Sequence, residues 1–179
     1  MSNFLASNSS QLGRGVVENT NQQFLRFDLD SEIRVMLPIA QITEVLKIKF
    51  AQIVPIPQMP PWVMGVYNWR GDILWMVDLS YLLGLKSWDR QIGFSDCNVV
   101  ILSPNRAIPQ AKDDIHLGLV VYRVEDLEEC NPTEIQSTQD KIAGKIANFA
   151  SGYWLESEGK IVSVLDGNAI ARAMPTQAD

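Results

Sequence analysis

The amino-acid sequence predicts an all-β fold with short helices, arranged as two similar small barrels. Short apolar runs bounded by Gly, Pro and Asp outnumber helical segments, and they do not alternate with helices as a parallel α/β sheet requires. One unit, made of two strands joined by a glycine-containing turn, an aspartate and a short helix, occurs at residues 65–83 and again at 153–174. Two copies of this unit at such a separation favour two barrels over one continuous sheet.

The composition excludes several classes of protein. The chain has 179 residues, 46% of them hydrophobic and 20% charged, which fits one domain or two closely packed small ones. Its net charge of -6 argues against nucleic acid as the partner, because phosphate binding needs clustered positive charge. No apolar run approaches the roughly 20 residues that span a bilayer, and no secretory signal is recognisable at the start. We therefore expect a cytoplasmic protein that does not insert into a membrane.

The first part of the chain predicts a flexible leader followed by two strands. Residues 1–21 are rich in Ser, Asn, Gln and Gly and show no apolar pattern. Apolar residues then alternate with polar ones at 23–29 and again at 33–37, which is typical of half-buried strands.

The segment after Pro38 permits two interpretations. Pro38 suits the first position of a helix. Apolar residues follow it at helical spacing: Ile39, Ile42, Val45 and Leu46. This spacing predicts a helix, with a return to strand by residues 45–48 as the alternative. Four prolines between residues 53 and 64 then exclude a central strand there.

The central hairpin is the most informative part of the sequence. Apolar runs at 65–69 and 73–77 flank a tight turn in which Gly71 supplies a backbone angle that other residues resist. Asn68 and Arg70 stand at the tip of this otherwise apolar hairpin. Packing alone does not account for an arginine in that position.

An aspartate follows each of the two predicted hairpins. Asp78 is placed to cap a short helix at 79–83, because its carboxylate can accept the free N–H groups of the first turn. Asp166 stands in the same position before a second short helix at 167–174. We expect structural roles for both side chains.

The remaining segments complete the second half of the fold. Strands at 98–102 and 116–124 predict another hairpin with a long tip at 103–115, and a polar linker at 86–95 precedes it. Residues 126–148 permit either helix or irregular loop, and residues 175–179 are a tail.

Catalytic chemistry has little support in the sequence. His116 is the one histidine, and no partner for a general base can be recognised near it. Cys97 and Cys130 lack metal-ligand spacing and are interpreted as two reduced thiols. We therefore predict no enzymatic activity, no metal and no cofactor.

Among the tryptophans, Trp75 and Trp154 are assigned to the core. Two further tryptophans, Trp62 and Trp88, lie beside prolines or in a polar linker. They are the better candidates for exposure or partner contact.

The central hairpin also carries a family resemblance. Residues 65–71 read GVYNWRG, and apolar residues and then Val-Asp-Leu at 77–79 follow. This order resembles the G-V-x-N-x-R-G-x-x-x-x-V-D-L core of CheW-like domains, adaptors that couple chemoreceptors to a histidine kinase. Tyr122 departs from the pattern, since the family usually has aspartate there. Shorter matches lie at 23–27, 39–45, 53–57, 117–124, 151–153 and 162–170, so the resemblance covers about residues 22–174.

The resemblance implies a fold, a function and partners. The fold would be two SH3-like five-stranded β-barrels packed on a shared core, occupying residues 22–174. The function would be that of a non-enzymatic scaffold in chemotaxis signal transduction, a two-component pathway that controls motility. Its partners would be the cytoplasmic tip of a methyl-accepting chemoreceptor or photoreceptor and the regulatory domain of a CheA-type histidine kinase. The kinase domain would pair with the ends of the barrels.

The resemblance also implies a receptor groove near the junction of the barrels. In the family the arginine matched by Arg70 belongs to the receptor-binding region, and the glutamate matched by Glu44 is close to it. We expect six residues in this groove: Ile39, Ile42, Glu44, Val45, Asn68 and Arg70. Pairing of Glu44 with Arg70 is our own hypothesis, and an ordinary surface ion pair is its alternative. Gly65 and Gly71 are expected to serve the turn.

Two other functions stay open at this point. A small acidic barrel protein could be a regulatory subunit of an unrelated complex, or an enzyme with a site in the cleft between the barrels. The sequence does not identify the output, whether flagellar, pilus-based or other. The tryptophan-rich hairpin has a fainter resemblance to adaptors of pilus-based phototaxis.

Overall fold

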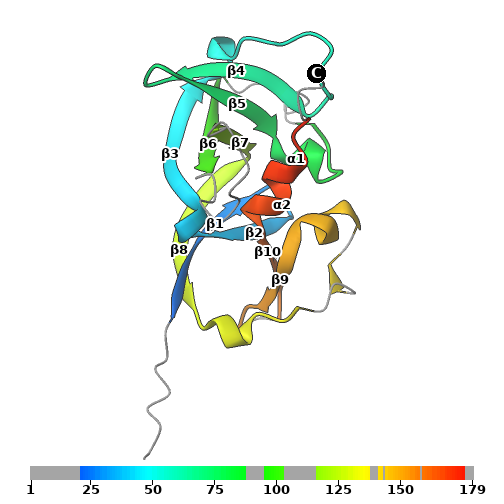
Figure 1. Ribbon diagram of the computed structural model, residues 1–179. Helices are drawn as coiled ribbons and strands as arrows, with labels where there is room; N and C mark the ends of the chain where they lie inside the picture. The colour runs from blue at the N-terminus through cyan, green and yellow to red at the C-terminus, as the bar shows by residue number, and fades with distance from the viewer. Residues whose placement is uncertain are drawn as a thin grey trace, which may run out of the picture.

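Two five-stranded sheets build the molecule, and each curls into a small barrel (Figure 1). The computed structural model describes residues 21–87, 95–102, 116–137, 141–142, 144–157 and 159–175. Barrel A, in the lower half of Figure 1, has the strand order β8-β1-β2-β10-β9, and barrel B above it has the order β3-β6-β7-β5-β4. The chain therefore begins barrel A, builds all of barrel B and then returns. This confirms the predicted fold of two five-stranded barrels.

Strand bounds follow the sequence closely in most places. Barrel A consists of β1 (Gln22–Asp28), β2 (Arg34–Pro38), β8 (Arg123–Cys130), β9 (Ala150–Leu155) and β10 (Ile161–Leu165). Barrel B consists of β3 (Ile42–Lys49), β4 (Val63–Trp69), β5 (Asp72–Asp78), β6 (Asp96–Leu102) and β7 (His116–Val121). Short helices connect them: η1 (Ile39–Gln41), η2 (Phe50–Gln52), α1 (Leu79–Leu82), η4 (Pro132–Glu134), η6 (Gly144–Phe149) and α2 (Gly167–Arg172).

The repeated unit forms once in each barrel. In barrel B, β4 and β5 form an antiparallel hairpin and Asp78 caps α1, its carboxylate accepting from the Tyr81 N–H at 3.0 Å. In barrel A, β9 and β10 form the hairpin and Asp166 caps α2 by accepting from the Asn168 N–H at 2.9 Å. The second strand of each hairpin also pairs in parallel with another strand, β5 with β7 and β10 with β2.

A shared core holds the two barrels together. It contains buried side chains from the outer faces of both sheets and from α1 and α2, among them Phe27, Leu37, Leu79, Leu119 and Ile170. In Figure 1 both α-helices lie at the junction of the barrels. The helices also bond across that junction. The Ser80 hydroxyl donates to the Leu29 carbonyl at 2.7 Å, and the Gly167 N–H donates to Gln41 Oε1 at 2.8 Å.

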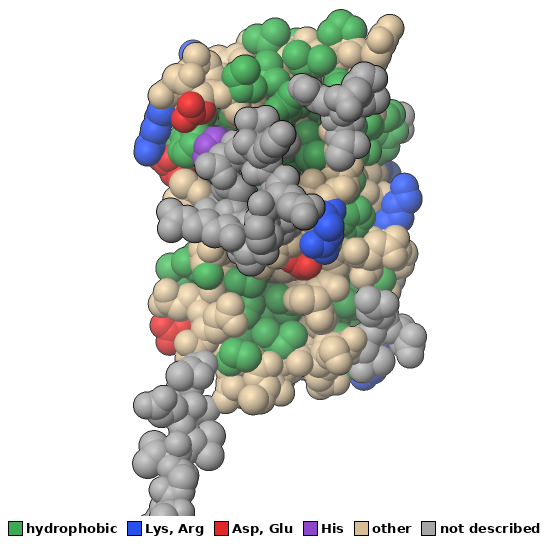
Figure 2. Space-filling model, in the orientation of Figure 1, with side chains coloured by type: hydrophobic (Ala, Val, Ile, Leu, Met, Phe, Trp, Pro, Cys, Tyr) green, Lys and Arg blue, Asp and Glu red, His purple; other side chains and the backbone are tan. Residues whose placement is uncertain are grey.

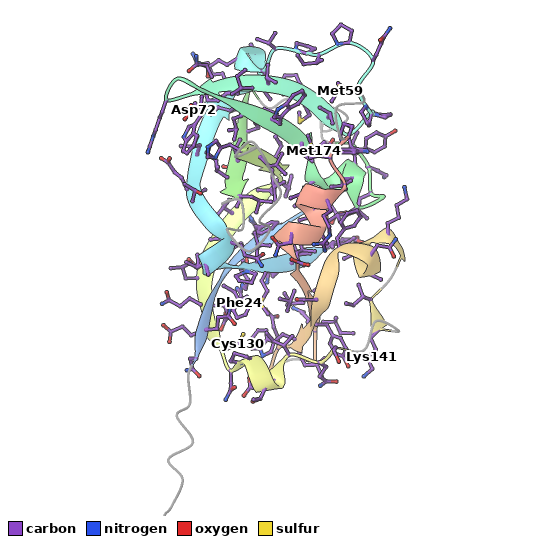
Figure 3. All side chains as sticks on the ribbon, in the orientation of Figure 1. Phe24, Met59, Asp72, Cys130, Lys141 and Met174 are labelled. Carbon is purple, nitrogen blue, oxygen red and sulfur yellow. The ribbon has the colours of Figure 1, made fainter. Side chains whose placement is uncertain are left out.

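Each barrel has its own interior besides the shared core. Because side chains alternate along a strand, one face of each sheet packs into the shared core and the other lines the barrel. The interior of barrel B includes Leu74, Met76 and Ile101. The interior of barrel A includes Phe24 and Cys130, which Figure 3 labels together in the lower half of the view.

Three predictions about local structure are wrong or incomplete. The strand expected at 116–124 is divided, because β7 ends at Val121 in barrel B and β8 begins at Arg123 in barrel A. Residues 39–46 form no continuous helix, because η1 ends after three residues and β3 begins at Ile42. A bulge in β3 between Ile42 and Glu44 mimics helical spacing, since one extra residue shifts the alternation of faces. The segment left open as helix or loop begins with a strand, β8, whose inward acidic residues hide the apolar alternation.

The tryptophans do not separate into core and exposed groups as the sequence predicts. Trp75 packs half-buried against the shared core, and Trp154 packs half-buried against the interior of barrel A. Trp62, a candidate for exposure or contact, is also half-buried against the shared core. The expectations for Trp88, the leader at 1–20, the long tip at 103–115 and the tail beyond 175 lie outside the described residues.

Candidate functional site

The β4–β5 hairpin ends in a two-residue turn that holds Arg70 in an unusual backbone conformation. Trp69 pairs with Asp72 across the turn, and both intervening residues have positive φ, 56° at Arg70 and 96° at Gly71. Asn68 closes the turn, because its side-chain oxygen accepts from the Gly71 N–H at 3.2 Å. Glycine adopts this conformation readily, whereas arginine in the left-handed region costs about 1–2 kcal/mol. Such local strain often marks a functional position.

A cluster of polar and aromatic side chains surrounds this turn, and we call Glu44, Trp69, Arg70 and His116 the tip cluster. Glu44 Oε2 accepts from Arg70 Nη2 at 2.8 Å and from Trp69 Nε1 at 3.3 Å. The Arg70 guanidinium also lies 5.2 Å from the centroid of the Trp69 ring. Glu44 on β3 thereby ties the strand to the hairpin tip.

His116 packs against Trp69 within the tip cluster. Its ring meets the Trp69 ring edge to face, with centroids 5.2 Å apart and an angle of 64° between planes. Its Nδ1 atom is buried and has no hydrogen-bond partner among the described residues. Figure 2 shows acidic, basic and histidine side chains gathered at the left of barrel B. In Figure 3, Asp72 marks the same end of the hairpin.

The tip cluster exposes the Arg70 guanidinium to solvent and restricts the orientation of its side chain. The Arg70 side chain is 68% exposed, whereas the Glu44 side chain is 28% exposed and Trp69 is buried. An ion pair this exposed contributes only about 0–1 kcal/mol to stability. Its main physical consequence is orientation, because stacking on Trp69 and bonding to Glu44 restrict the arginine rotamers while leaving N–H donors available.

The apolar residues expected in the groove lie on a different face of β3 from Glu44. Ile42 pairs with Leu102 and Val45 pairs with Val100, and both partners belong to the shared core. Glu44 pairs with Ile101, which belongs to the interior of barrel B. Ile42 and Val45 therefore face the junction of the barrels, as the bulge in β3 allows.

These placements divide the six expected groove residues into two groups. Glu44, Asn68 and Arg70 meet at the hairpin tip. Ile39 and Ile42 pack half-buried against the shared core, and Val45 beside them is 41% exposed. The two groups adjoin along β3, which runs from the barrel junction to the tip cluster.

Three residues outside the six expected ones also contribute to the tip cluster or to the apolar surface at the barrel junction. Trp69 and His116 complete the tip cluster. Leu127 on β8 is 56% exposed and pairs with Leu25 of the shared core, so it extends the apolar surface at the barrel junction. The tryptophan beside Arg70 was a usable signal, whereas the contact of His116 with it depends on parallel pairing of β5 and β7.

The described residues offer no evident catalytic centre. No group of three or more His, Cys, Asp or Glu among them is arranged to hold a metal ion. Burial raises the pKa of the Cys97 thiol to about 11, with a contribution from Asp96. Burial likewise raises the pKa of Cys130 to about 11, with contributions from Glu128 and Glu134. Both thiols are therefore protonated and unreactive at neutral pH.

The structure defines a domain of two five-stranded barrels, and comparisons with known proteins identify its family. A family model described as CheW-like domain matches residues 23–174. A chemotaxis protein CheW of Rhizobium meliloti (strain 1021) is 30% identical over 116 residues, which are 65% of this chain and 67% of that protein. A chemotaxis protein CheW of Bacillus subtilis (strain 168) is 25% identical over 144 residues, which are 76% of this chain and 85% of that protein.

The fold has a counterpart among solved structures. The scaffolding protein TtCheW from Thermoanaerobacter tengcongensis superimposes with a TM-score of 0.66 and 20% identity, covering 82% of this chain and 89% of that one. The chain belongs to the CheW-like domain family. It is a non-enzymatic scaffold of the chemotaxis type. Within the described residues, no helix is both long enough and apolar enough to cross a membrane.

Proposed function

We propose that the chain couples a chemoreceptor-like protein to a CheA-type histidine kinase in the cytoplasm. The receptor would contribute the helical tip of a methyl-accepting signalling domain, and the kinase would contribute its regulatory domain. Membership of the CheW-like domain family supports this scaffold role. The pathway would be chemotaxis or a related motility response such as phototaxis.

The arrangement of Arg70 carries the assignment of the receptor surface. Its guanidinium is exposed, held by Glu44 and Trp69, and set in a strained turn that packing does not require. A preorganised arginine of this kind favours a partner with carboxylate or carbonyl acceptors, because less rotamer entropy is lost on binding.

Apolar residues beside the tip cluster fit a helical partner. Ile39, Ile42 and Val45 line the barrel junction next to the arginine, and exposed Leu127 lies on the other barrel at the edge of the same core. A helix that binds in a groove presents apolar anchors on one face and polar groups beside them. The proposed receptor groove therefore combines Ile39, Ile42, Glu44, Val45, Asn68 and Arg70, with Leu127 added from the structure.

Signal transfer through such a scaffold is positional. A receptor that binds better in one conformation shifts the population of the attached kinase toward the matching state, without bond chemistry in the scaffold. The shared core favours this role, because it joins both barrels and both helices into one packed unit. The kinase regulatory domain would dock on barrel ends, away from the tip cluster.

Replacing Arg70 with alanine tests the receptor surface. Charge-assisted hydrogen bonds from a guanidinium contribute about 1.5–3 kcal/mol each, so Arg70→Ala should weaken receptor binding about tenfold or more. Kinase binding should be nearly unchanged, and stability should fall by less than about 1 kcal/mol. Titrating the variant separately against a receptor signalling fragment and a kinase regulatory domain measures both effects, with a thermal melt as the check on folding.

Arg172→Ala is the matched control for this experiment. Arg172 is similarly exposed, at 61%, and also forms an ion pair, but it lies on α2. Equal weakening by both variants would indicate a general charge effect. Loss of binding to both partners after Arg70→Ala, or to neither, would refute the receptor assignment. Binding of neither protein by the wild-type chain would instead favour a regulatory subunit of an unrelated complex.

A further inference from the structure

A hollow of about 450 Å³ lies beside α1 at the junction of the barrels, and we call it the aromatic pocket. Its lining comes from the segment before β4, from α1 and the turn after it, and from η6. The lining residues are Pro61, Trp62, Tyr81, Gly84, Leu85 and Lys145. In Figure 1, α1 lies to the right of the junction and β3 to the left, so this pocket is apart from the proposed receptor groove.

Backbone hydrogen bonds hold the walls of the aromatic pocket. The Asp78 N–H donates to the Trp62 carbonyl at 2.8 Å, and the Gly84 N–H donates to the Tyr81 carbonyl at 3.0 Å. Gly84 has a positive φ of 84°, and a β-carbon there would approach Lys145 Cδ to 3.1 Å. Glycine at this position therefore lets the Lys145 side chain lie against the turn that follows α1.

The two aromatic side chains bring unused hydrogen-bond donors to this largely apolar surface. Trp62 is half-buried and Tyr81 is 39% exposed. Neither the Trp62 indole N–H nor the Tyr81 hydroxyl bonds to a described residue, whereas the indole N–H groups of Trp69 and Trp154 donate to glutamates. A partner that covers the pocket must supply acceptors, because a buried donor without a partner is costly.

The unused donors select among peptide conformations. A helix bonds most of its carbonyls within itself, and an added strand needs a sheet edge, whereas none of the lining residues belongs to a strand. A polyproline II segment has no internal hydrogen bonds, so its carbonyls stay free to accept. Such segments bind in grooves lined by aromatic side chains. The aromatic pocket therefore suits a proline-rich segment better than a helix or a strand.

The charge around the pocket favours an acidic residue in that segment. Among the described lining residues Lys145 alone is charged, and its exposed ammonium forms no ion pair with a described residue. Exposed Lys86 follows Leu85 and adds a second cation. The Asp78 carboxylate, which caps α1, is buried and already accepts two hydrogen bonds. An excess of positive charge thus surrounds this pocket in a chain of net charge -6.

We propose that the aromatic pocket binds a proline-rich segment of a protein partner, with an acidic residue of that segment beside Lys145. Carbonyls of the segment accept from the Trp62 indole and the Tyr81 hydroxyl, and its proline rings pack against Pro61 and Leu85. A polyproline II segment is already extended before it binds, so little conformational entropy is lost. This contact is additional to the proposed receptor and kinase contacts, since it lies at the barrel junction and uses no receptor-groove residue.

Titration of the full chain with an oligoproline peptide that has glutamate at both ends tests the proposal. In nitrogen-15 NMR, the indole N–H signal of Trp62 should move saturably as it donates to the peptide. The indole signals of Trp69 and Trp154 should stay in place, because both groups already donate to glutamates. An alanine-rich helical peptide with the same terminal glutamates should leave the Trp62 signal unmoved.

Two conservative variants measure the donors separately. Trp62→Phe keeps an aromatic ring without the N–H, and Tyr81→Phe removes only a hydroxyl. Each should weaken peptide binding about three- to tenfold, as expected for one lost hydrogen bond. Trp154→Phe is the matched control, because it removes the indole N–H of another half-buried tryptophan, on barrel A. It should change binding by less than about twofold.

A charge cycle tests the acidic residue. An oligoproline peptide with glutamine at both ends should bind the wild-type chain about two- to fivefold more weakly than the glutamate peptide, as expected for an exposed ion pair. Lys145→Gln should remove this preference. A preference that persists in the Lys145→Gln protein would refute the placement of the acidic residue.

Other outcomes would overturn the proposal as a whole. They are an unmoved Trp62 signal, equal weakening by Trp154→Phe, and equal binding of the helical peptide, which would indicate a helix as the occupant. Movement of the Trp62 signal on dilution of the chain alone would assign the pocket to a second copy instead. If Trp62→Phe does not fold, Tyr81→Phe decides, because its hydroxyl lies at an exposed position. Undiminished binding by a folded Tyr81→Phe protein would refute the proposed recognition.

Discussion

Barrel A and barrel B share a repeated unit and a strand count, but their interiors are filled in opposite ways. The interior of barrel B is apolar throughout its buried part, with Leu74, Met76, Val99 and Ile101 almost without exposure. The interior of barrel A has a small apolar cluster around Phe24 and Met36 at one end and a network of ion pairs at the other. Each interior contains one buried cysteine with a raised pKa.

This difference shows that the barrel topology does not depend on apolar filling of both interiors. The shared core draws on the outer faces of both sheets, so barrel A is stabilised from outside while charges occupy part of its inside. The salt bridges that replace hydrophobic packing there add little net stability, because the cost of desolvating the charges offsets much of their Coulomb attraction. We infer that barrel B is the rigid support of the tip cluster, whereas barrel A exchanges some packing for a charged surface.

Truncation of Leu74 should give the largest loss of stability. This side chain is fully buried in barrel B, and Leu→Ala changes in cores cost about 2–5 kcal/mol through lost burial and a residual cavity. Because the loss is hydrophobic, the difference in unfolding free energy from wild type should not depend on salt concentration. Urea denaturation at low and high sodium chloride measures this. A loss that shrank on addition of salt would mean that barrel B is also held by charges.

Removal of Arg26 should lower the unfolding free energy by less than truncation of Leu74 does. Unlike that loss, it should depend on salt concentration. Arg26 contacts Glu128 and Glu156 at 3.0 Å and Glu125 at 3.4 Å, and Met would keep its aliphatic volume. Arg26→Met would leave three carboxylates facing one another, at a cost of about 1–2 kcal/mol, since all are partly solvated. Salt screens this repulsion, so the loss should decrease as ionic strength rises. A loss independent of salt would mean that Arg26 acts mainly by packing.

The sequence predicts most strands of both barrels, but it misses β3 in barrel B and most of β8 in barrel A. The β4–β5 hairpin has apolar strands, a glycine turn and an aspartate cap, so local patterns define it fully. In β8 the inward positions include Glu125 and Glu128, so its alternation of polar and apolar residues is lost. Only the contacts with Arg26 and Arg34, about 90 to 100 residues away in sequence, make those glutamates compatible with the interior.

The sequence predicts the candidate site only in part, for a similar reason. Arg70 and Glu44 are recognisable from the family pattern, and the structure places them in contact. The contribution of His116 depends on the parallel pairing of β5 with β7, which brings it beside Leu74 and so near Trp69. Long-range pairing of this kind leaves no local pattern in the sequence. The bulge in β3, which turns Ile42 toward the shared core and Glu44 toward the hairpin, leaves none either.

The two helix caps give the closest comparison between the barrels, and the smallest expected effect is at Asp166. Asp78 is 2% exposed and bonds both the Tyr81 N–H and the Ser87 hydroxyl, at 3.0 and 2.9 Å. Asp166 has a side chain 29% exposed and pairs loosely with Arg172 at 3.6 Å. Loss of a cap costs about 0.5–2 kcal/mol. Asp78→Ala should approach the upper value, since the buried carboxylate accepts two hydrogen bonds that are both lost, and Asp166→Ala should approach the lower one, since water can replace its more exposed oxygen.

Urea midpoints of the two alanine variants measure this difference, and the corresponding asparagine variants are the controls. Asparagine caps a helix about as well as aspartate, so Asp166→Asn should restore nearly all of the lost stability. Asp78→Asn should restore less, because the second Asp78 oxygen accepts from Ser87 and an amide nitrogen in that place cannot accept. Equal losses for the two alanine variants would show that burial at the cap does not distinguish the barrels. The contrast would then be confined to their interiors, where Leu74 and Arg26 test it.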